Sequence, residues 1–266
     1  MTVTVALAQF HTDLDKDANR KLVEDAFTGA RDAGARLLVT PEYSMYVDWA
    51  NEHTGEPWAE PLDGPFVTAV REAARASGVA GVVGMSERLP DEPRASNTLV
   101  AVDGSGQLLG VYRKVHLYDA FGYRESDTFV PAPISEPLVF TLGDITFGAI
   151  TCYDMRFPES ARRLADAGAT AIIIPAAWAA GPAKEDHWAT LARARAIENT
   201  AYVLACCQTG PDCTGQSVII DPMGTVVAGA GELPGMVTAP LSAERVDAVR
   251  RVNPSLANRR FTVVPA

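Results

Sequence analysis

The spacing of apolar and polar positions along the chain predicts an α/β protein. Residues 3–9 and 36–40 are rich in β-branched and apolar side chains, and each run predicts a buried strand. Residues 15–33 lie between them and repeat apolar positions at a helical period, which predicts an amphipathic helix closed by Gly34. The first part of the chain therefore begins as a strand, a helix and a second strand.

The following segment continues this alternation and ends in a hairpin. A polar loop is predicted over residues 44–65, a helix over 66–77 and a strand over 79–85. Asp103-Gly104-Ser105-Gly106 is typical of a hairpin turn between two strands. The second arm of this hairpin, residues 108–113, leads directly to Lys114.

Two segments of the second half resemble two segments of the first, in the same order. DAGARLLVTPEYS (32–44) matches DAGATAIIIPAAW (166–178), and TLVAVDGSGQLL (98–109) matches SVIIDPMGTVV (217–227). This predicts a duplicated unit of strand, helix, strand, helix, strand and hairpin. Such a unit buries one face of its sheet against helices and the other against its twin. We therefore expect a four-layer α-β-β-α sandwich of two mixed sheets.

The sandwich is expected to form one domain over residues 1–266. A C-terminal tail from about residue 249 is expected to pack along the surface or against a neighbouring subunit. A net charge of −10, from 33 acidic and 23 basic residues, argues against nucleic acid or an anionic membrane as a partner. The N-terminus lacks a basic region before its apolar run, so no signal peptide is expected.

The cysteines do not have the spacing of a metal site, so no metal is expected. Cys206 and Cys207 lie in an apolar run and are interpreted as core residues of a strand, and all four cysteines suit a reducing cytoplasm. Cys152 ends the predicted strand 145–151, and a helix is expected to begin near Pro158. It is either one more buried core cysteine or a nucleophile at the edge of a sheet.

Glu42 and Lys114, like Cys152, each follow a predicted strand. Because ligands of α/β sheets bind at the carboxyl ends of strands, these three side chains are expected to converge. Cys152 would attack an acyl carbon, Glu42 would carry the proton, and Lys114 would stabilise the oxyanion. The backbone N–H of Tyr153 would be a second oxyanion donor. Glu125 would hold Lys114 or the attacking water; the alternative is a helix N-cap region with Ser126.

TPEYS around Glu42, YRKVHLYD around Lys114 and CYDMRFPE around Cys152 resemble the nitrilase superfamily of carbon–nitrogen hydrolases. Residues 181–203 and 215–227 match later segments of the same family. The resemblance implies the α-β-β-α fold, a Glu–Lys–Cys triad with a supporting Glu125, and an acyl-thioester intermediate. It also implies a small-molecule amide substrate, no cofactor, and a homodimer or higher homo-oligomer packed through helices.

Cys-Tyr-Asp-Met-Arg-Phe is most similar to the omega-amidases and deaminated-glutathione amidases, which cleave the terminal amide of dicarboxylic acid monoamides. Arg156 would then pair with a substrate carboxylate, or it forms a structural salt bridge. Trp178, with Phe121 and Tyr123, is expected to border the pocket and favours a less acidic, more apolar substrate. An extra Lys-Glu-Asp at 184–186 departs from the family and should border the pocket as well.

Three alternative functions stay open. A nitrile or an N-carbamoyl compound would be hydrolysed by the same triad. Cys152 would form a cysteine-protease-like dyad with His116 or His187, although Glu42 and Lys114 would then have no role. The chain would otherwise be a catalytically silent oligomeric scaffold, a reading that the intact Glu, Lys and Cys set disfavours.

Overall fold

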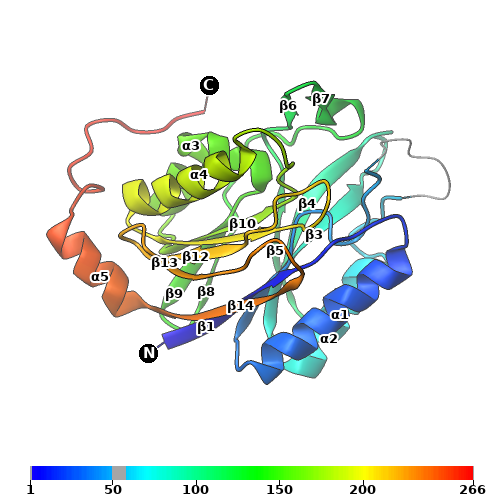
Figure 1. Ribbon diagram of the computed structural model, residues 1–266, viewed down its shortest axis with the longest axis horizontal. Helices are drawn as coiled ribbons and strands as arrows, with labels where there is room; N and C mark the ends of the chain where they lie inside the picture. The colour runs from blue at the N-terminus through cyan, green and yellow to red at the C-terminus, as the bar shows by residue number, and fades with distance from the viewer. Residues whose placement is uncertain (1, 50–57, 266) are drawn as a thin grey trace.

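A computed structural model of the chain describes residues 2–49 and 58–265. Its centre is a pair of six-stranded sheets stacked face to face (Figure 1). The first sheet has the spatial order β14 (Gly235–Ser242), β1 (Thr2–Gln9), β2 (Leu37–Val39), β3 (Ala80–Arg88), β4 (Ala95–Val102), β5 (Leu108–Arg113). The second has the order β8 (Val139–Leu142), β9 (Ile145–Ala149), β10 (Ala171–Ala176), β11 (Tyr202–Cys207), β12 (Val218–Ile220), β13 (Val226–Gly229).

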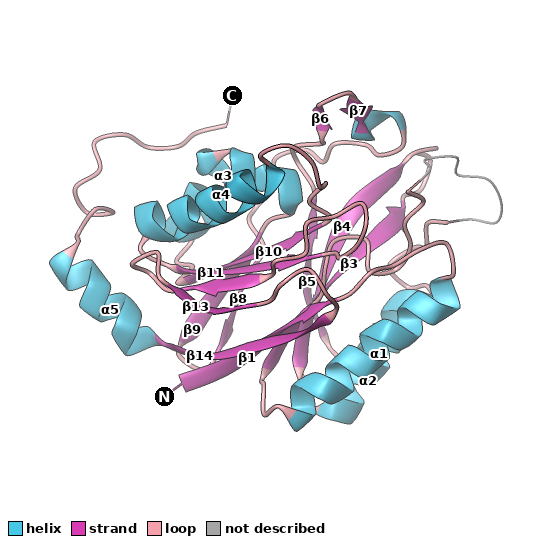
Figure 2. Ribbon diagram, viewed as in Figure 1, coloured by secondary structure: helices cyan, strands magenta, loops and turns pink. Residues whose placement is uncertain are grey.

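Helices cover the outer face of each sheet, which completes four layers (Figure 2). The first sheet is covered by α1 (Lys16–Asp32) and α2 (Pro65–Ser77). The second is covered by α3 (Pro158–Asp166) and α4 (Lys184–Asn199). A fifth helix, α5 (Ala243–Val252), follows β14 at one end of the sandwich. The predicted α-β-β-α sandwich is therefore confirmed.

Each layer is held by its own group of buried side chains. Residues from both sheets, among them Leu7 and Leu204, form the core between the sheets. Cys206 belongs to this core, whereas Cys207 packs in the layer between the second sheet and its helices. Burying such side chains contributes roughly 1.5–3 kcal/mol each. Both cysteines are thus core residues of a strand, as the sequence predicts.

The two halves of the chain repeat one topology. The first half runs β1-α1-β2-α2-β3-β4-β5 and the second runs β9-α3-β10-α4-β11-β12-β13. In each half the first three strands pair in parallel and the hairpin then adds two antiparallel strands. The edge strands β14 and β8 add antiparallel to β1 and β9. This topology confirms the duplication that the sequence predicts.

Some boundaries differ from those expected. Of the predicted loop 44–65, residues 50–57 lie outside the described residues. Residues 249–252 are still helical, so the extended tail begins at Asn253. The tail returns along the surface to α3, where Arg259 pairs with Asp166. Nowhere in the described ranges is a helix both long and apolar enough to cross a membrane.

Candidate active site

The ends of three strands place the predicted catalytic side chains. Glu42 follows β2, Lys114 follows β5 directly, and Cys152 begins a 3-10 turn, η2 (Cys152–Arg156), after β9. The exposed fractions of Glu42, Lys114 and Cys152 are only 1%, 2% and 7%. Three residues that are far apart in the sequence therefore come together in one buried region, at the ends of strands from both sheets.

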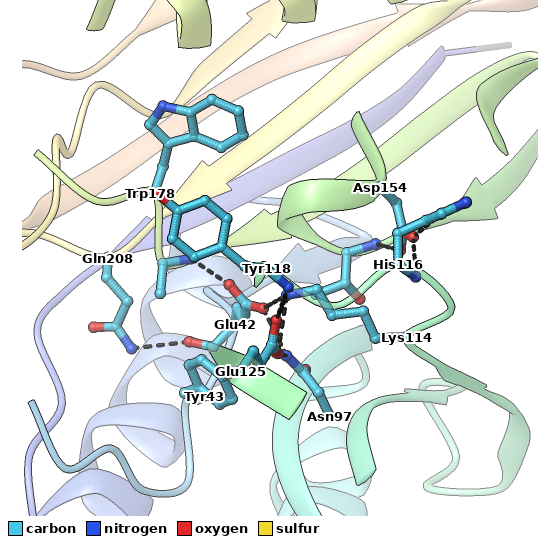
Figure 3. A network of polar contacts seen from close by, with 12 residues as sticks. Glu42, Tyr43, Asn97, Lys114, His116, Tyr118, Glu125, Asp154, Trp178 and Gln208 are labelled. Atoms are coloured by element: carbon cyan, nitrogen blue, oxygen red, sulfur yellow. Dashed lines mark hydrogen bonds and ion pairs between the residues drawn. The ribbon is translucent and has the colours of Figure 1, made fainter. Parts of the chain in front are cut away.

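Lys114 is held between two carboxylates (Figure 3). Its Nζ lies 2.8 Å from Glu42 Oε1, 2.8 Å from Glu125 Oε2 and 3.1 Å from Glu125 Oε1. Burial alone would lower the pKa of Lys114, but Glu125 and Glu42 together hold it well above its usual value. The ammonium group is therefore charged across the physiological pH range.

Glu125 accepts hydrogen bonds from several groups besides Lys114. The donors are Asn97 Nδ2 at 2.9 Å, the Tyr43 hydroxyl at 2.7 Å and the backbone N–H of Tyr118 at 2.6 Å. Burial opposes ionisation of Glu125, but Lys114 and these donors lower its pKa below the usual range. The side chain thus lies against Lys114, and the alternative of a simple N-cap region does not describe its contacts.

Glu42 is fixed by contacts on both oxygens and on its backbone. Asn97 Nδ2 donates to Oε1 at 2.7 Å, and the backbone N–H of Ala177 donates to Oε2 at 2.7 Å. Gln208 Nε2 donates to the Glu42 carbonyl at 2.9 Å. A Cβ at Gly84 would lie 2.9 Å from Glu42 Cα, so only glycine at that position of β3 lets the loop approach this closely. The carboxylate is therefore preorganised.

Cys152 has a backbone conformation that side chains rarely adopt. Its φ of 43° lies in the left-handed region, at a cost of roughly 1–3 kcal/mol that the surrounding contacts must offset. Burial and the negative charge of Glu42 raise the pKa of its thiol, and Lys114 opposes this only in part. The thiol form of Cys152 is therefore favoured over the thiolate.

Asp154 ties the Cys152 turn to the segment that carries Lys114. Its Oδ2 accepts from the Thr151 N–H at 3.0 Å and from the Tyr112 hydroxyl at 2.7 Å. Its Oδ1 accepts from the His116 N–H at 3.1 Å and contacts His116 Nδ1 at 2.8 Å. Because Asp154 is fully buried, these contacts fix the relative position of the two segments.

A small pocket of about 230 Å³ opens beside Cys152. The three predicted substrate-binding residues, Tyr153, Arg156 and Trp178, all line it. The Arg156 guanidinium carbon lies 4.6 Å from the centroid of the Trp178 ring, a cation–π geometry. The alternative that Arg156 forms a structural salt bridge finds no support, since no carboxylate in the described part of the chain pairs with it. Lys184 also lines the pocket.

The two histidines of the dyad alternative have other contacts. His116 stacks on Phe157 with 3.8 Å between ring centroids and faces Asp154. His187 Nδ1 lies 3.4 Å from Arg156. Within the described residues neither histidine is hydrogen-bonded to Cys152, so the dyad alternative has no support in these contacts. Across residues 2–49 and 58–265, no group of three or more His, Cys, Asp or Glu is arranged to hold a metal ion.

Sequence reasoning did not single out three residues of this network. Asn97 bridges Glu42 and Glu125, Tyr43 bonds Glu125, and Asp154 organises the turn. Asn97 lies between Ser96 and Thr98 at the polar start of β4, so its neighbours in the sequence do not single it out. The roles of all three residues depend on contacts between segments that are far apart in the sequence.

Comparison with known proteins gives concordant matches. Residues 4–251 match the family model described as carbon-nitrogen hydrolase. The chain is 36% identical to a protein named deaminated glutathione amidase from Escherichia coli O157:H7, covering 97% of each chain. It also resembles the crystal structure of Saccharomyces cerevisiae Nit3, a member of branch 10 of the nitrilase superfamily, with a TM-score of 0.86 and 30% identity, covering 98% of this chain and 97% of Nit3.

A third match concerns the chemistry of a cysteine. A mutant of the amidase from Nesterenkonia sp. AN1 shows covalent addition of the acetamide moiety of fluoroacetamide at its active-site cysteine. That structure matches with a TM-score of 0.81 and 29% identity, and 97% of this chain and 94% of the amidase are covered. From its fold, its family model and these relatives, the chain belongs to the carbon–nitrogen hydrolases of the nitrilase superfamily.

Proposed function

We propose that this hydrolase is an amidase that releases ammonia from a small carboxylic acid amide through a thioester on Cys152. The observation that carries the proposal is the contact of Lys114 with both Glu42 and Glu125, close to Cys152, which lines a small pocket. A base, a cation and a nucleophile around one cavity are what acyl transfer from an amide requires.

The first half of the reaction forms the acyl-enzyme. Glu42 takes the proton of the Cys152 thiol as sulfur attacks the carbonyl carbon of the amide. The negative charge that develops on the carbonyl oxygen is stabilised by the Lys114 ammonium and the backbone N–H of Tyr153. Glu42 then gives its proton to the nitrogen, the C–N bond breaks and ammonia leaves. One oxyanion donor of this kind contributes about 2.7–4 kcal/mol to transition-state stabilisation.

The second half returns the enzyme to its starting state. Glu42 removes a proton from water as the water oxygen attacks the thioester carbon. The C–S bond then breaks, the sulfur recovers its proton from Glu42, and the carboxylic acid is released. Glu125 acts through Lys114: its ionised carboxylate keeps the ammonium in place during both steps.

The pocket limits the size of the acyl group. It is small and partly open to solvent, and it lies between the Tyr118, Tyr153 and Trp178 side chains, so a short acyl chain fits best. Trp178 and Tyr153 would flank that chain, and Arg156 would meet a polar group at its far end. A nitrile or an N-carbamoyl compound would engage the same Glu42, Lys114 and Cys152, so these substrates are the alternative that must be compared directly.

A panel of small amides, nitriles and N-carbamoyl compounds tests the proposal by ammonia release. We expect amides to give the highest kcat/KM, and Cys152→Ala to abolish release while the free energy of unfolding stays close to that of the wild type. Cys213→Ala, which removes a buried cysteine that does not line the pocket, is the matched control. Preference for nitriles or N-carbamoyl compounds would overturn the amide assignment, and silence on the whole panel would favour the scaffold alternative.

A further inference from the structure

Glu42 and Tyr43 are consecutive residues, yet both side chains join the same buried network. The Glu42 carboxylate contacts Lys114, and the Tyr43 hydroxyl donates to Glu125. In an extended strand two consecutive side chains would point to opposite faces. Tyr43 instead has a φ of 59°, in the left-handed region that residues other than glycine rarely adopt. The backbone must therefore be held in this conformation for both groups to reach the site.

Two side chains hold the carbonyl groups on this turn. Gln208 Nε2 donates to the Glu42 carbonyl at 2.9 Å (Figure 3). The Thr12 hydroxyl donates to the Tyr43 carbonyl at 3.0 Å. Gln208 and Thr12 also bond each other, because Gln208 Nε2 donates to Thr12 Oγ1 at 2.6 Å and the Thr12 N–H donates to Gln208 Oε1 at 3.0 Å. The two side chains thus form one clamp on the left-handed turn.

Gln208 is itself fixed on every side. It is fully buried, both hydrogens of its amide nitrogen are donated, and its amide oxygen accepts a hydrogen bond. Its N–H donates to the Ala176 carbonyl at 2.9 Å, and its carbonyl accepts from the Gly215 N–H at 3.0 Å. A buried polar group whose hydrogen bonds are made is held rigidly. Gln208, which follows β11, therefore offers a fixed donor to the loop that follows β2.

Packing against β3 limits the position of the same turn but does not set the direction of its carbonyl groups. A Cβ at Gly84 would lie 2.9 Å from both Glu42 Cα and the Tyr43 nitrogen, so the strand lies directly against the turn. Hydrogen bonds to the carbonyl oxygens are directional, and they fix the planes of the two peptide groups. The clamp thus determines where the Glu42 side chain points.

We propose that Gln208 is a positioning residue for the reaction, which together with Thr12 holds the left-handed turn that directs the Glu42 carboxylate to Lys114. This inference rests on the proposed role of Glu42 as the base. Gln208 acts through Glu42 and has no contact with the reacting atoms. Loss of its hydrogen bond frees the peptide group after Glu42 to rotate, so the carboxylate moves although every group that takes part in the chemistry is still present.

The variant Gln208→Met removes both donors with little change in the length of the side chain. We expect kcat to fall at least about 10-fold with little change in KM, because a misplaced base weakens the transition state more than substrate binding. The matched control is Gln9→Met. Gln9 is also buried, donates to the Gly231 and Leu233 carbonyls and accepts from the Ser217 N–H, all away from Glu42. Its loss should lower stability but leave kcat unchanged.

Alkylation of Cys152 by iodoacetamide reports the position of Glu42 without turnover. Glu42 raises the pKa of the Cys152 thiol, so its displacement should move the midpoint of the alkylation profile to lower pH. We expect this shift in Gln208→Met and no shift in Gln9→Met. A role of Gln208 in stability alone would leave the midpoint of the folded variant where it is in the wild type.

Thr12 provides a second route to the same test if Gln208→Met does not fold. Thr12→Val removes the hydroxyl with the shape kept and should reproduce both effects, whereas Thr12→Ser keeps the hydroxyl and should retain most of the wild-type kcat. Wild-type kcat and midpoint in Gln208→Met or Thr12→Val would overturn the inference and leave the amidase proposal standing. Equal losses of kcat in Gln208→Met and Gln9→Met would also overturn it. If the wild type hydrolyses no amide, the amidase proposal fails, and the alkylation profiles still decide whether Gln208 positions Glu42.

Discussion

At the scale of single residues, the site contains one ammonium and two carboxylates around a thiol. Lys114 contacts Glu42 and Glu125, so the ionised cluster carries one net negative charge. That charge and burial raise the pKa of Cys152, which disfavours a preformed thiolate. In the proposed mechanism, Cys152 becomes a nucleophile only when Glu42 takes its proton, so proton transfer and attack are coupled.

The variant Glu42→Gln tests this coupling through pH dependence. Glu42 raises the pKa of the Cys152 thiol, so removing its charge should lower that pKa, and the thiolate should appear at lower pH. We expect hydrolysis to be lost, while the midpoint of the pH profile for alkylation of Cys152 by iodoacetamide moves to lower pH. Peptide mass spectrometry measures alkylation at each cysteine. A midpoint that stays fixed or rises would contradict the proposed electrostatics.

At the scale of elements, the site is assembled by the ends of strands and by the close packing of loops. β4 contributes Asn97, whose amide bridges Glu42 and Glu125, and the Lys114 N–H donates to the Asn97 carbonyl at 2.8 Å. The hairpin thus fixes the Lys114 backbone directly, and it fixes the Lys114 side chain through the two carboxylates that Asn97 bridges. On the other side, Gly84 in β3 allows the Glu42 loop to lie directly against the sheet.

The variant Gly84→Ala should move Glu42 without removing any catalytic group. The new Cβ would lie 2.7 Å from the Pro41 carbonyl and 2.9 Å from the Tyr43 nitrogen, so the loop must shift. We expect a loss of stability of about 1–3 kcal/mol, as for other overpacked sites. The larger effect should be on kcat, because small displacements of catalytic groups are costly.

The matched control is Gly229→Ala in β13, where the nearest atom would lie at an ordinary 3.6 Å. Urea unfolding and steady-state kinetics on both variants separate the two effects. An unchanged kcat in Gly84→Ala would mean that the position of the Glu42 loop is not critical for catalysis.

At the scale of the whole molecule, duplication brings equivalent loops of the two halves together. The sequence match places Tyr43, after β2, opposite Ala177, after β10. In the structure the Ala177 N–H donates to Glu42, and the Tyr43 hydroxyl donates to Glu125. Equivalent positions thus support the same carboxylate network from two sides. These hydrogen bonds join loops of both sheets, so they can persist only while the two sheets stay stacked. We therefore expect activity to require an intact core between the sheets.

Leu204→Ala tests the contribution of that core. Leu204 is fully buried between the sheets, so its truncation should lower the free energy of unfolding by about 2–5 kcal/mol. The same change at Leu233, which is 79% exposed, should alter it by no more than about 0.5 kcal/mol. Urea denaturation followed by fluorescence measures both. Equal effects of the two variants would contradict the assignment of the stacked faces as the core.

Much of this fold was predictable because the buried strands and the hairpin turn have local signatures. The structure has the predicted strand that ends at Gln9, the hairpin turn at Asp103 and the start of a helix at Pro158. No strand was predicted over residues 235–242, which form the edge strand β14. Pro240 is tolerated in this strand because β14 pairs with β1 alone.

The site was predictable only in part. Glu42, Lys114 and Cys152 stand at strand ends, and strand ends are visible in the sequence. The support from Asn97 and Asp154 depends on contacts between segments that no local pattern encodes. The two cations that line the pocket are Arg156 and Lys184, and the sequence analysis expected Arg156 and residues 184–186 there.

The most direct test of the central claim is the identity of the covalent intermediate. Wild-type protein mixed with a small amide and quenched in acid within the first turnovers should carry the acyl group on the peptide that contains Cys152. The mass increase should equal that of the acyl group minus one hydrogen, and it should be absent in Cys152→Ala. An adduct on Cys206 or Cys213, or ammonia release with no adduct on any cysteine under conditions where deacylation limits the rate, would contradict the account.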